Sequence, residues 1–359
     1  MEISVCLIVK NEEEVLDRCL NSAKQFADEI IVVDTGSCDK TKQIALKYTP
    51  LVFDYIWNDD FADARNFSFN KAGKEYVMWL DADDVITDAE IAKINLLKKQ
   101  LVADTYMLKY ALSFGGSANN FCYFRERIMR RDARAVWQGF IHEAIAPFGK
   151  IEYVDITIEH HKVKLANPKR NLKIYNKHIK NGEILSTRAQ YYYAKELYYN
   201  GYYKSSIKEL KKYLKMPGKF TPNEMDSYLT IAICYRKLQN LGLALDYLID
   251  ALKHISPSSE MLCEIGELLT EMGDFDKAIF FYKCATSVDI DYKSGQFVDK
   301  NYYYLYPYLQ LTMLYYKVGE YEKSKHYHML SKATAPENPS VKYNEQFFKN
   351  NESKNNLTS

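Results

Sequence analysis

Four short apolar runs in the first 80 residues each end in a group of polar side chains. The runs cover residues 3–9, 29–34, 51–57 and 76–80. Amphipathic segments separate them, and strand–helix–strand alternation with short connections indicates a mostly parallel sheet covered on both faces. Ligands of such sheets bind beyond the carboxyl ends of the strands. We therefore expect a Rossmann-like α/β domain whose functional edge carries these polar groups.

The fourth run leads directly into three carboxylates, Asp81, Asp83 and Asp84. On an extended backbone, side chains two residues apart point the same way, so Asp81 and Asp83 share one side. Like charges this close repel each other unless a cation lies between them. Carboxylates that leave coordination positions open suit Mn²⁺ or Mg²⁺ carrying a phosphate group. The alternative interpretation is a polar turn before a helix that begins near Thr87.

Length and composition limit the classes of function. A length of 359 residues points to two or three domains, and a formal net charge of +1 provides no overall field for binding nucleic acid. No run approaches the ~20 apolar residues needed to span a bilayer, and the N-terminal run turns acidic without a basic leader. The seven cysteines lack metal-binding spacing, which favours reduced thiols. We expect a cytoplasmic protein without a transmembrane segment.

After about residue 168 the pattern becomes helical and repeats. Pairs of helices around a short turn are predicted at residues 191–214, 226–254, 260–288 and 302–335. The matched turn positions, separated by 38, 34 and 46 residues, are Gly201, Gln239, Gly273 and Gly319. A period near 34, with a turn residue followed by an aromatic and then a small residue, is typical of tetratricopeptide repeats. A plain helical bundle is the alternative.

These patterns predict four successive segments. They are an α/β domain at 1–165, a linker with helical character at 166–187, helical repeats at 188–345 and a polar, disordered tail at 346–359. Most of the 31 tyrosines follow residue 190, where the majority would pack between helices. Tyrosine runs cover several helix faces, so some are exposed. Because concave repeat surfaces bind peptides, we expect a polypeptide partner, or a homodimer formed through the repeats.

Six segments of the first half match a known pattern in order and spacing. They are LIVKNEE (7–13), VVDTGSCDKT (32–41), DFADARNFSF (60–69), WLDADD (79–84), RERIMRR (125–131) and VWQGFIHEAI (136–145). Over roughly residues 1–165 the chain thus resembles a family 2 glycosyltransferase of GT-A fold. Together with the repeats, it resembles bacterial enzymes that glycosylate peptides or proteins, including the peptide S-glycosyltransferases of the glycocin type. It also resembles transferases that decorate lipopolysaccharide cores.

The resemblance implies an inverting, metal-dependent enzyme that moves a hexose from a UDP-sugar to a sulfur or oxygen of a polypeptide side chain. One alternative acceptor is a saccharide or lipid-linked saccharide of the cell envelope. An alternative from another class is a catalytically inactive domain that serves as an interaction scaffold. The choice of sugar depends on the loop around residues 111–124. The sequence of this loop does not identify the hexose.

The resemblance assigns the donor side of the site to residues at the strand ends. Asp83 is the implied metal ligand, and Asp81 reaches the ribose or the metal. Asp34 is implied to bind the nucleotide base or ribose, with helix capping as the alternative. Arg65 is implied to face the nucleotide, with a surface ion pair as the alternative.

Further donor contacts are expected from the first two strand ends and from a basic cluster. Asn11 and Glu12 would line the nucleotide pocket, and Gly36 would permit a close approach of the backbone. Of the four arginines in residues 125–131, one or two are expected to contact phosphate or a carboxylate, because arginine binds anions in a bidentate way. Arg130 is our candidate among them.

The acceptor side needs a base that takes the acceptor's proton. The resemblance assigns this role to Glu143, and Asp84 is the second candidate. Trp137 would offer a floor on which a sugar could stack. His142 is either a core histidine or part of the acceptor site.

A late histidine completes metal coordination in many enzymes of this fold. His160 and His161 end a strand-like segment in the corresponding region. Alternation along a strand places their side chains on opposite faces, so only one can point inward. We choose His160.

Overall fold

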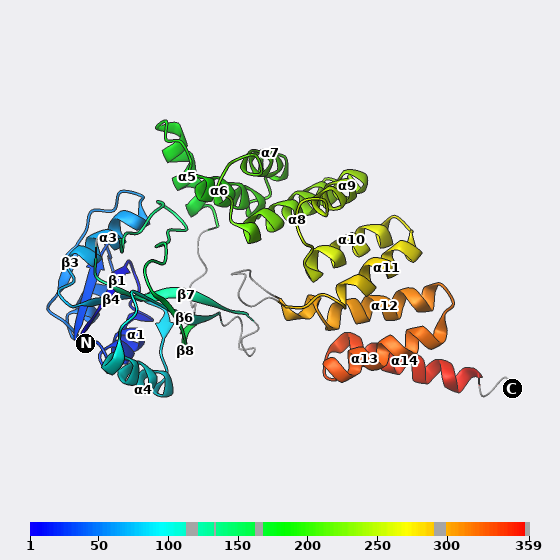
Figure 1. The fold of residues 1–359 in the computed structure, drawn as a ribbon, viewed down its shortest axis with the longest axis horizontal. Helices are drawn as coiled ribbons and strands as arrows, with labels where there is room; N and C mark the ends of the chain where they lie inside the picture. The colour runs from blue at the N-terminus through cyan, green and yellow to red at the C-terminus, as the bar shows by residue number, and fades with distance from the viewer. Residues whose placement is uncertain (113–120, 133, 162–167, 291–298, 356–359) are drawn as a thin grey trace. The chain divides into compact units, whose positions relative to one another are not determined.

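The computed structural model describes residues 1–112, 121–132, 134–161, 168–290 and 299–355 (Figure 1). The chain divides into two compact units, Met1–Ala189 and Gln190–Ser359. The first contains the predicted α/β domain and the second the predicted repeats. The first unit continues past the predicted boundary at residue 165, because helix α5 (Arg170–Lys180) packs on it through Tyr175 and His178.

One sheet runs through the described part of the first unit, with the strand order β3-β2-β1-β4-β7-β6-β8-β5. Strands β1 to β4 pair in parallel, and β6 pairs in parallel with β8. Strand β7 runs antiparallel to β4 and β6, and β5 runs antiparallel to β8. This arrangement confirms the predicted GT-A-like, mostly parallel sheet. The strands are β1 (Ile3–Val9), β2 (Glu29–Asp34), β3 (Val52–Asp54), β4 (Tyr76–Trp79), β5 (Asp84–Val85), β6 (Thr105–Leu112), β7 (Phe121–Arg130) and β8 (Ile151–His160).

Helices cover both faces of this sheet, as the continuous apolar strands require. Along β1, Val5 and Leu7 point to the face covered by α1 and α4, whereas Cys6 points to the face covered by α3. All four residues of β4 are buried. Because helices cover both faces of the sheet, the ends of its strands remain for binding a ligand. The helices of this unit are α1 (Leu16–Ala23), α2 (Thr41–Ala45), α3 (Phe61–Asn70), α4 (Asp88–Leu97) and α5, with a 3-10 turn, η1, at Lys98–Gln100.

The second unit consists of successive helix pairs, which confirms the prediction of tetratricopeptide-like repeats (Figure 1). Five residues after each predicted turn lies a small, fully buried residue: Ser206, Ala244, Ala278 and Ser324. Nowhere in the described chain is a helix both long and apolar enough to cross a bilayer. The helices are α6 (Thr187–Tyr199, which begins in the first unit), α7 (Tyr203–Tyr213), α8 (Thr221–Lys237), α9 (Leu241–Ala251), α10 (Ser259–Glu271), α11 (Phe275–Ala285), η2 (Lys300–Tyr302), α12 (Leu305–Lys317), α13 (Tyr321–Thr334) and α14 (Pro339–Asn355).

Helix α14 corrects the predicted disordered tail. Residues 346–355, predicted to be disordered, continue this helix. Phe347 packs on Tyr316 at 4.9 Å between ring centroids, and Phe348 packs on His328 at 5.2 Å. These contacts bury part of the aromatic surface of Phe347 and Phe348. The otherwise polar composition of the segment led to the prediction of disorder. Residues 356–359 lie outside the described part of the chain.

The four repeat turns share a left-handed backbone, which explains the recurrence of glycine. The φ angles are +79° at Gly201, +83° at Gly273, +82° at Gly319 and +61° at Gln239. A side chain at such an angle is strained, since Cβ comes too close to the backbone. Gln239 alone among these turns bears that strain.

We therefore expect Gln239→Gly to stabilise the second unit by about 0.5–1 kcal/mol, because glycine relieves the left-handed strain. The reciprocal control, Gly273→Gln, should destabilise it by a similar amount. Urea unfolding followed by circular dichroism measures both changes. A destabilised Gln239→Gly variant would contradict the proposed strain.

Glu260 makes the second unit sensitive to pH. Burial, with the charges of Asp226 and Asp299, raises the pKa of Glu260 to about 7 from its ordinary 4.5. Between these values the folded chain holds a proton that the unfolded chain has released, so stability falls as the pH rises through this window. Glu260→Gln should therefore stabilise the protein at about pH 8, on the order of 2 kcal/mol, and change little at about pH 5. Thermal unfolding at both pH values, with exposed Glu322→Gln as control, measures the effect.

Candidate active site

A tight turn after β4 carries the three carboxylates. The backbone N–H of Asp84 donates to the carbonyl of Asp81 at 3.0 Å, and the N–H of Asp81 donates to Asp84 Oδ2 at 3.0 Å. Strand β5 begins at Asp84 and pairs with His160 at the end of β8. The turn and the end of β8 are therefore held together by backbone pairing.

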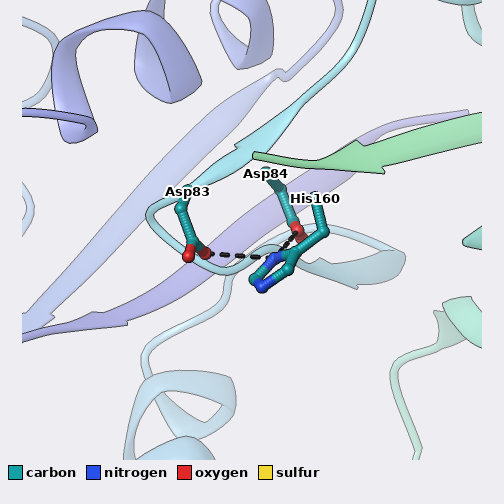
Figure 2. Close-up of side chains that lie close together, drawn as sticks. All are labelled: Asp83, Asp84 and His160. Atoms are coloured by element: carbon teal, nitrogen blue, oxygen red, sulfur yellow. Dashed lines mark hydrogen bonds and ion pairs between the residues drawn. The ribbon is translucent and has the colours of Figure 1, made fainter. Parts of the chain in front are cut away.

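Asp83, Asp84 and His160 form the cluster shown in Figure 2, with potential ligand atoms all within 4.8 Å of one another. His160 Nδ1 lies 3.3 Å from Asp83 Oδ1 and 3.3 Å from Asp84 Oδ1. Two carboxylates and an imidazole suit a divalent ion, so the donor set fits the implied Mn²⁺ or Mg²⁺. His161 points elsewhere, to Glu159 at 2.7 Å. Of the two histidines, His160 is the one at the carboxylates.

Electrostatics within the cluster reflect crowding of negative charge. Burial raises the pKa of Asp83, although His160 acts in the opposite direction. Burial alone would lower the pKa of His160, but the hydrogen bond to Asp84 and the nearby carboxylates outweigh it and raise that pKa. A cation at this position would relieve the same repulsion.

Asp84 is a buried anchor of the turn. Its carboxylate accepts hydrogen bonds from Tyr110 Oη at 3.0 Å and from Arg127 at 2.9 Å, besides the Asp81 N–H. Asp84 and Arg127 are both fully buried, and the Arg127 guanidinium lies 3.5 Å from the ring centre of Trp79. A carboxylate with these partners has no open side toward an acceptor. This geometry favours Glu143 over Asp84 as the base.

Arg65, on helix α3, joins the two halves of the site. Its Nε donates to Glu143 Oε1 at 2.7 Å, and one terminal nitrogen donates to Asp81 Oδ1 at 2.7 Å. The guanidinium also lies 5.2 Å from the ring of Trp79 and 4.7 Å from that of Trp137. Burial opposes ionisation of Asp81, but the charges of Arg65 and Arg127 and the hydrogen bond from Arg65 together outweigh it and hold the pKa of Asp81 at about 2. Arg65 is thus a buried bridge between carboxylates and not the surface ion pair of the alternative interpretation.

Glu143 lies in a constrained loop. Gln138 and Ala144 exchange backbone hydrogen bonds of 3.0 and 3.1 Å, closing residues 138–144 into what we call the base loop. Within it, Gly139 and His142 adopt φ angles of +93° and +52°. A left-handed non-glycine residue is strained and persists only where surrounding contacts hold it. His142 is half-buried and forms the turn of this loop.

The predicted nucleotide-binding residues meet at the carboxyl ends of β1 and β2. Asp34 Oδ1 accepts hydrogen bonds from the N–H groups of Gly36 at 3.2 Å and Ser37 at 2.9 Å. The N–H of Asn11 donates to Ser37 Oγ at 2.9 Å, and Glu12 follows it. One carboxylate oxygen of Asp34 therefore stabilises the turn. The four predicted residues, Asn11, Glu12, Asp34 and Gly36, all lie at the carboxyl ends of β1 and β2.

The sheet register corrects the predicted placement of Arg130 at the phosphate site. Arg130 pairs with Tyr76, the first residue of β4, and forms an ion pair with Glu75 at 3.9 Å. It therefore lies at the opposite end of β4 from the carboxylates. Arg125 and Arg127, further along the antiparallel strand, approach the Trp79 ring instead. Which of the four arginines reaches the carboxylates depends on the register of β7 against β4, for which the sequence carries no local signal.

Trp137 is also corrected as a floor for a sugar. Only 2% of its surface is exposed, and its ring packs against Trp79 at 5.2 Å and under Arg65. Its aromatic face thus supports the arginine rather than a ligand. Residues 113–120, within the loop expected to select the sugar, lie outside the described part of the chain.

A parallel edge with a carboxylate turn, a histidine and an arginine-held glutamate fits the GT-A glycosyltransferase domain implied by the sequence motifs. Residues 4–147 match the model of the family described as glycosyl transferase family 2. This part of the chain is similar to the members of that family. The match ends before α5 and the helical repeats.

Three curated relatives are similar to parts of the chain. A TPR repeat-containing protein of Synechococcus elongatus is 43% identical over 83 residues, 23% of this chain and 21% of that protein. The SPbeta prophage-derived glycosyltransferase SunS of Bacillus subtilis is 29% identical over 146 residues, 39% of this chain and 34% of SunS. The lipopolysaccharide core biosynthesis glycosyltransferase LpsC of Rhizobium meliloti is 26% identical over 164 residues, 42% of this chain and 59% of LpsC. The chain thus spans less than two thirds of the length of each.

Among solved structures, S. aureus TarS 1–349 in complex with UDP-GlcNAc aligns with a TM-score of 0.39 at 14% identity. The alignment covers 94% of this chain and 92% of that one.

We expect Asp84→Asn to destabilise the first unit by about 3–5 kcal/mol, because it leaves the Arg127 charge buried without its partner. The control Asp155→Asn breaks the ion pair between Asp155 and Lys109 on the same sheet. The Asp155 side chain is 77% exposed. This substitution should cost less than about 1 kcal/mol. Urea unfolding measures both, and equal costs would show that Asp84 is not an anchor.

Proposed function

We propose that this chain is an inverting, metal-dependent glycosyltransferase that transfers a hexose from a UDP-sugar to a polypeptide side chain. The observation that carries the proposal is the Arg65 bridge, with 2.7 Å contacts to both Asp81 and Glu143. It brings a carboxylate suited to base catalysis next to the carboxylate turn. Donor and acceptor chemistry can then meet at one edge of the sheet.

On the donor side, Asp83 and His160 would hold Mn²⁺ or Mg²⁺, with Asp84 behind them and Asp81 shared with the ribose. The bound ion supplies charge neutralisation for the departing nucleoside diphosphate. Asn11, Glu12, Asp34 and Gly36 form the strand-end turn at which the nucleotide would bind. Arg65 serves the carboxylates directly, so its contribution to nucleotide binding would pass through Asp81.

On the acceptor side, Glu143 is the proposed base. Arg65 orients Oε1 through a charge-assisted hydrogen bond, while Oε2 accepts no hydrogen bond from the described residues. The acceptor oxygen or sulfur bonds to the anomeric carbon as the bond from that carbon to the diphosphate oxygen breaks. The acceptor's proton passes to Glu143, and the leaving UDP carries away the electron pair.

The repeats support a polypeptide acceptor, because tetratricopeptide-like units commonly bind peptides. The similarity to glycocin-type enzymes in sequence motifs points the same way. The similarity to LpsC favours a second candidate, transfer to a saccharide of lipopolysaccharide type. Intact-mass analysis of polypeptide and saccharide acceptors incubated with the full chain, UDP-sugars and Mn²⁺ distinguishes the two.

The central test compares Asp83→Ala and Glu143→Gln in assays of UDP release and transfer from a panel of UDP-sugars. Asp83→Ala should abolish metal-dependent turnover. Glu143→Gln should retain UDP binding in calorimetry but lower kcat about 10²–10⁴-fold, because it removes the base. Glu152→Gln on β8 is the matched control. Undiminished transfer in either site variant would refute the corresponding assignment.

A further inference from the structure

Helix α5 follows the family match yet contacts the base loop. The His178 ring stacks on the Phe140 ring with centroids 3.9 Å apart and planes 2° from parallel. Tyr175, one turn earlier on the same helix, packs on Phe140 at 5.1 Å. Phe140 lies three residues before Glu143, so α5 packs against the loop that carries the proposed base.

The same helix also holds the segment before α3. His178 Nε2 lies 3.1 Å from the carbonyl oxygen of Asp59, and its Nδ1 lies 2.6 Å from Glu183 Oε1. Lys177 forms an ion pair with the Asp59 carboxylate. Both ring nitrogens of His178 thus lie within hydrogen-bond distance of an oxygen atom, one on Asp59 and one on Glu183.

These contacts bracket the Arg65–Glu143 pair. Asp59 has a left-handed φ of +70° and precedes Asp60, which caps α3, the helix of Arg65. The N–H of Phe61, the first residue of α3, donates to the Phe140 carbonyl at 2.9 Å. One imidazole thus contacts the segments that lead to both Arg65 and Glu143.

We propose that His178 is a positioning residue, which sets the geometry between Arg65 and Glu143 by clamping Phe140 and Asp59. The inference rests on the proposed function, in which Glu143 is the base. Strain at Asp59 and in the base loop must be held by surrounding contacts, and the α5 clamp supplies them. Arg188 adds a second hold, since its Nε donates to the His142 carbonyl at 3.1 Å.

Loss of the clamp should misplace the base without disturbing the donor site. We expect His178→Ala to lower kcat about 10- to 100-fold, because small misplacement of a catalytic group has effects of that size. KM for the UDP-sugar should stay within about twofold, since Asp83 and His160 are held by separate contacts. His178→Phe keeps a stacking ring but loses the polar bonds, so its kcat should be intermediate. Lys180→Ala, an exposed change on the same helix, is the control.

A double-mutant cycle with Glu143→Gln separates positioning from general stability. If His178 acts through Glu143, His178→Ala should lower kcat no further in the Glu143→Gln background. Fully additive losses would overturn the proposal. If Glu143→Gln alone leaves kcat unchanged, the base assignment fails instead, and the cycle shows this directly.

Hydrogen exchange tests the clamp independently of activity. In the full-length His178→Ala protein, amides of residues 138–144 and of Phe61 should exchange faster, while residues 76–84 keep their protection. Unchanged exchange in the base loop would overturn the proposal whatever the activity shows. Faster exchange throughout the first unit would also overturn it, because it would indicate a merely structural role.

Discussion

A buried guanidinium between two carboxylates organises the first unit. Arg65 is 8% exposed and contacts Asp81 and Glu143, from segments 62 residues apart, at 2.7 Å each. Burying these charges is favourable only when the partners and geometry are right. The pairing therefore ties α3, the carboxylate turn and the base loop into one arrangement, and loss of Arg65 would leave both carboxylates without their shared partner.

A second buried ion pair, between Arg127 and Asp84, stabilises the turn that carries Asp81. Arg127 and Asp84 have no exposed side-chain surface, and they hold the turn that presents Asp83 and Asp81. Three guanidinium groups lie near the Trp79 indole. Their central carbons are 5.2 Å (Arg65), 5.0 Å (Arg125) and 3.5 Å (Arg127) from the ring centroid. Asp81 and Asp84 are thus each paired with an arginine, Arg65 and Arg127 respectively.

Much of the site could be anticipated from local pattern. Buried strands with polar ends place Asn11, Asp34 and Asp83 at one edge, since parallel strands share their direction. Alternation along β8 allowed only one of two histidines to face inward, and His160 does so. Arg130 and Trp137 were misplaced because their surroundings depend on the register of β7 against β4 and on packing between distant segments. Neither has a periodic signal in the sequence.

The sequence by itself determined the two classes of unit, because apolar periodicity and turn residues are local properties. It also determined which carboxylates could gather at the strand ends. Only the tertiary structure decided what each charge does: Arg65 joins Asp81 to Glu143, Asp84 is committed to Arg127, and α5 grips the base loop through His178. Such roles arise from contacts between residues far apart in the chain, where the free energy of burying a charge depends on the partner that meets it.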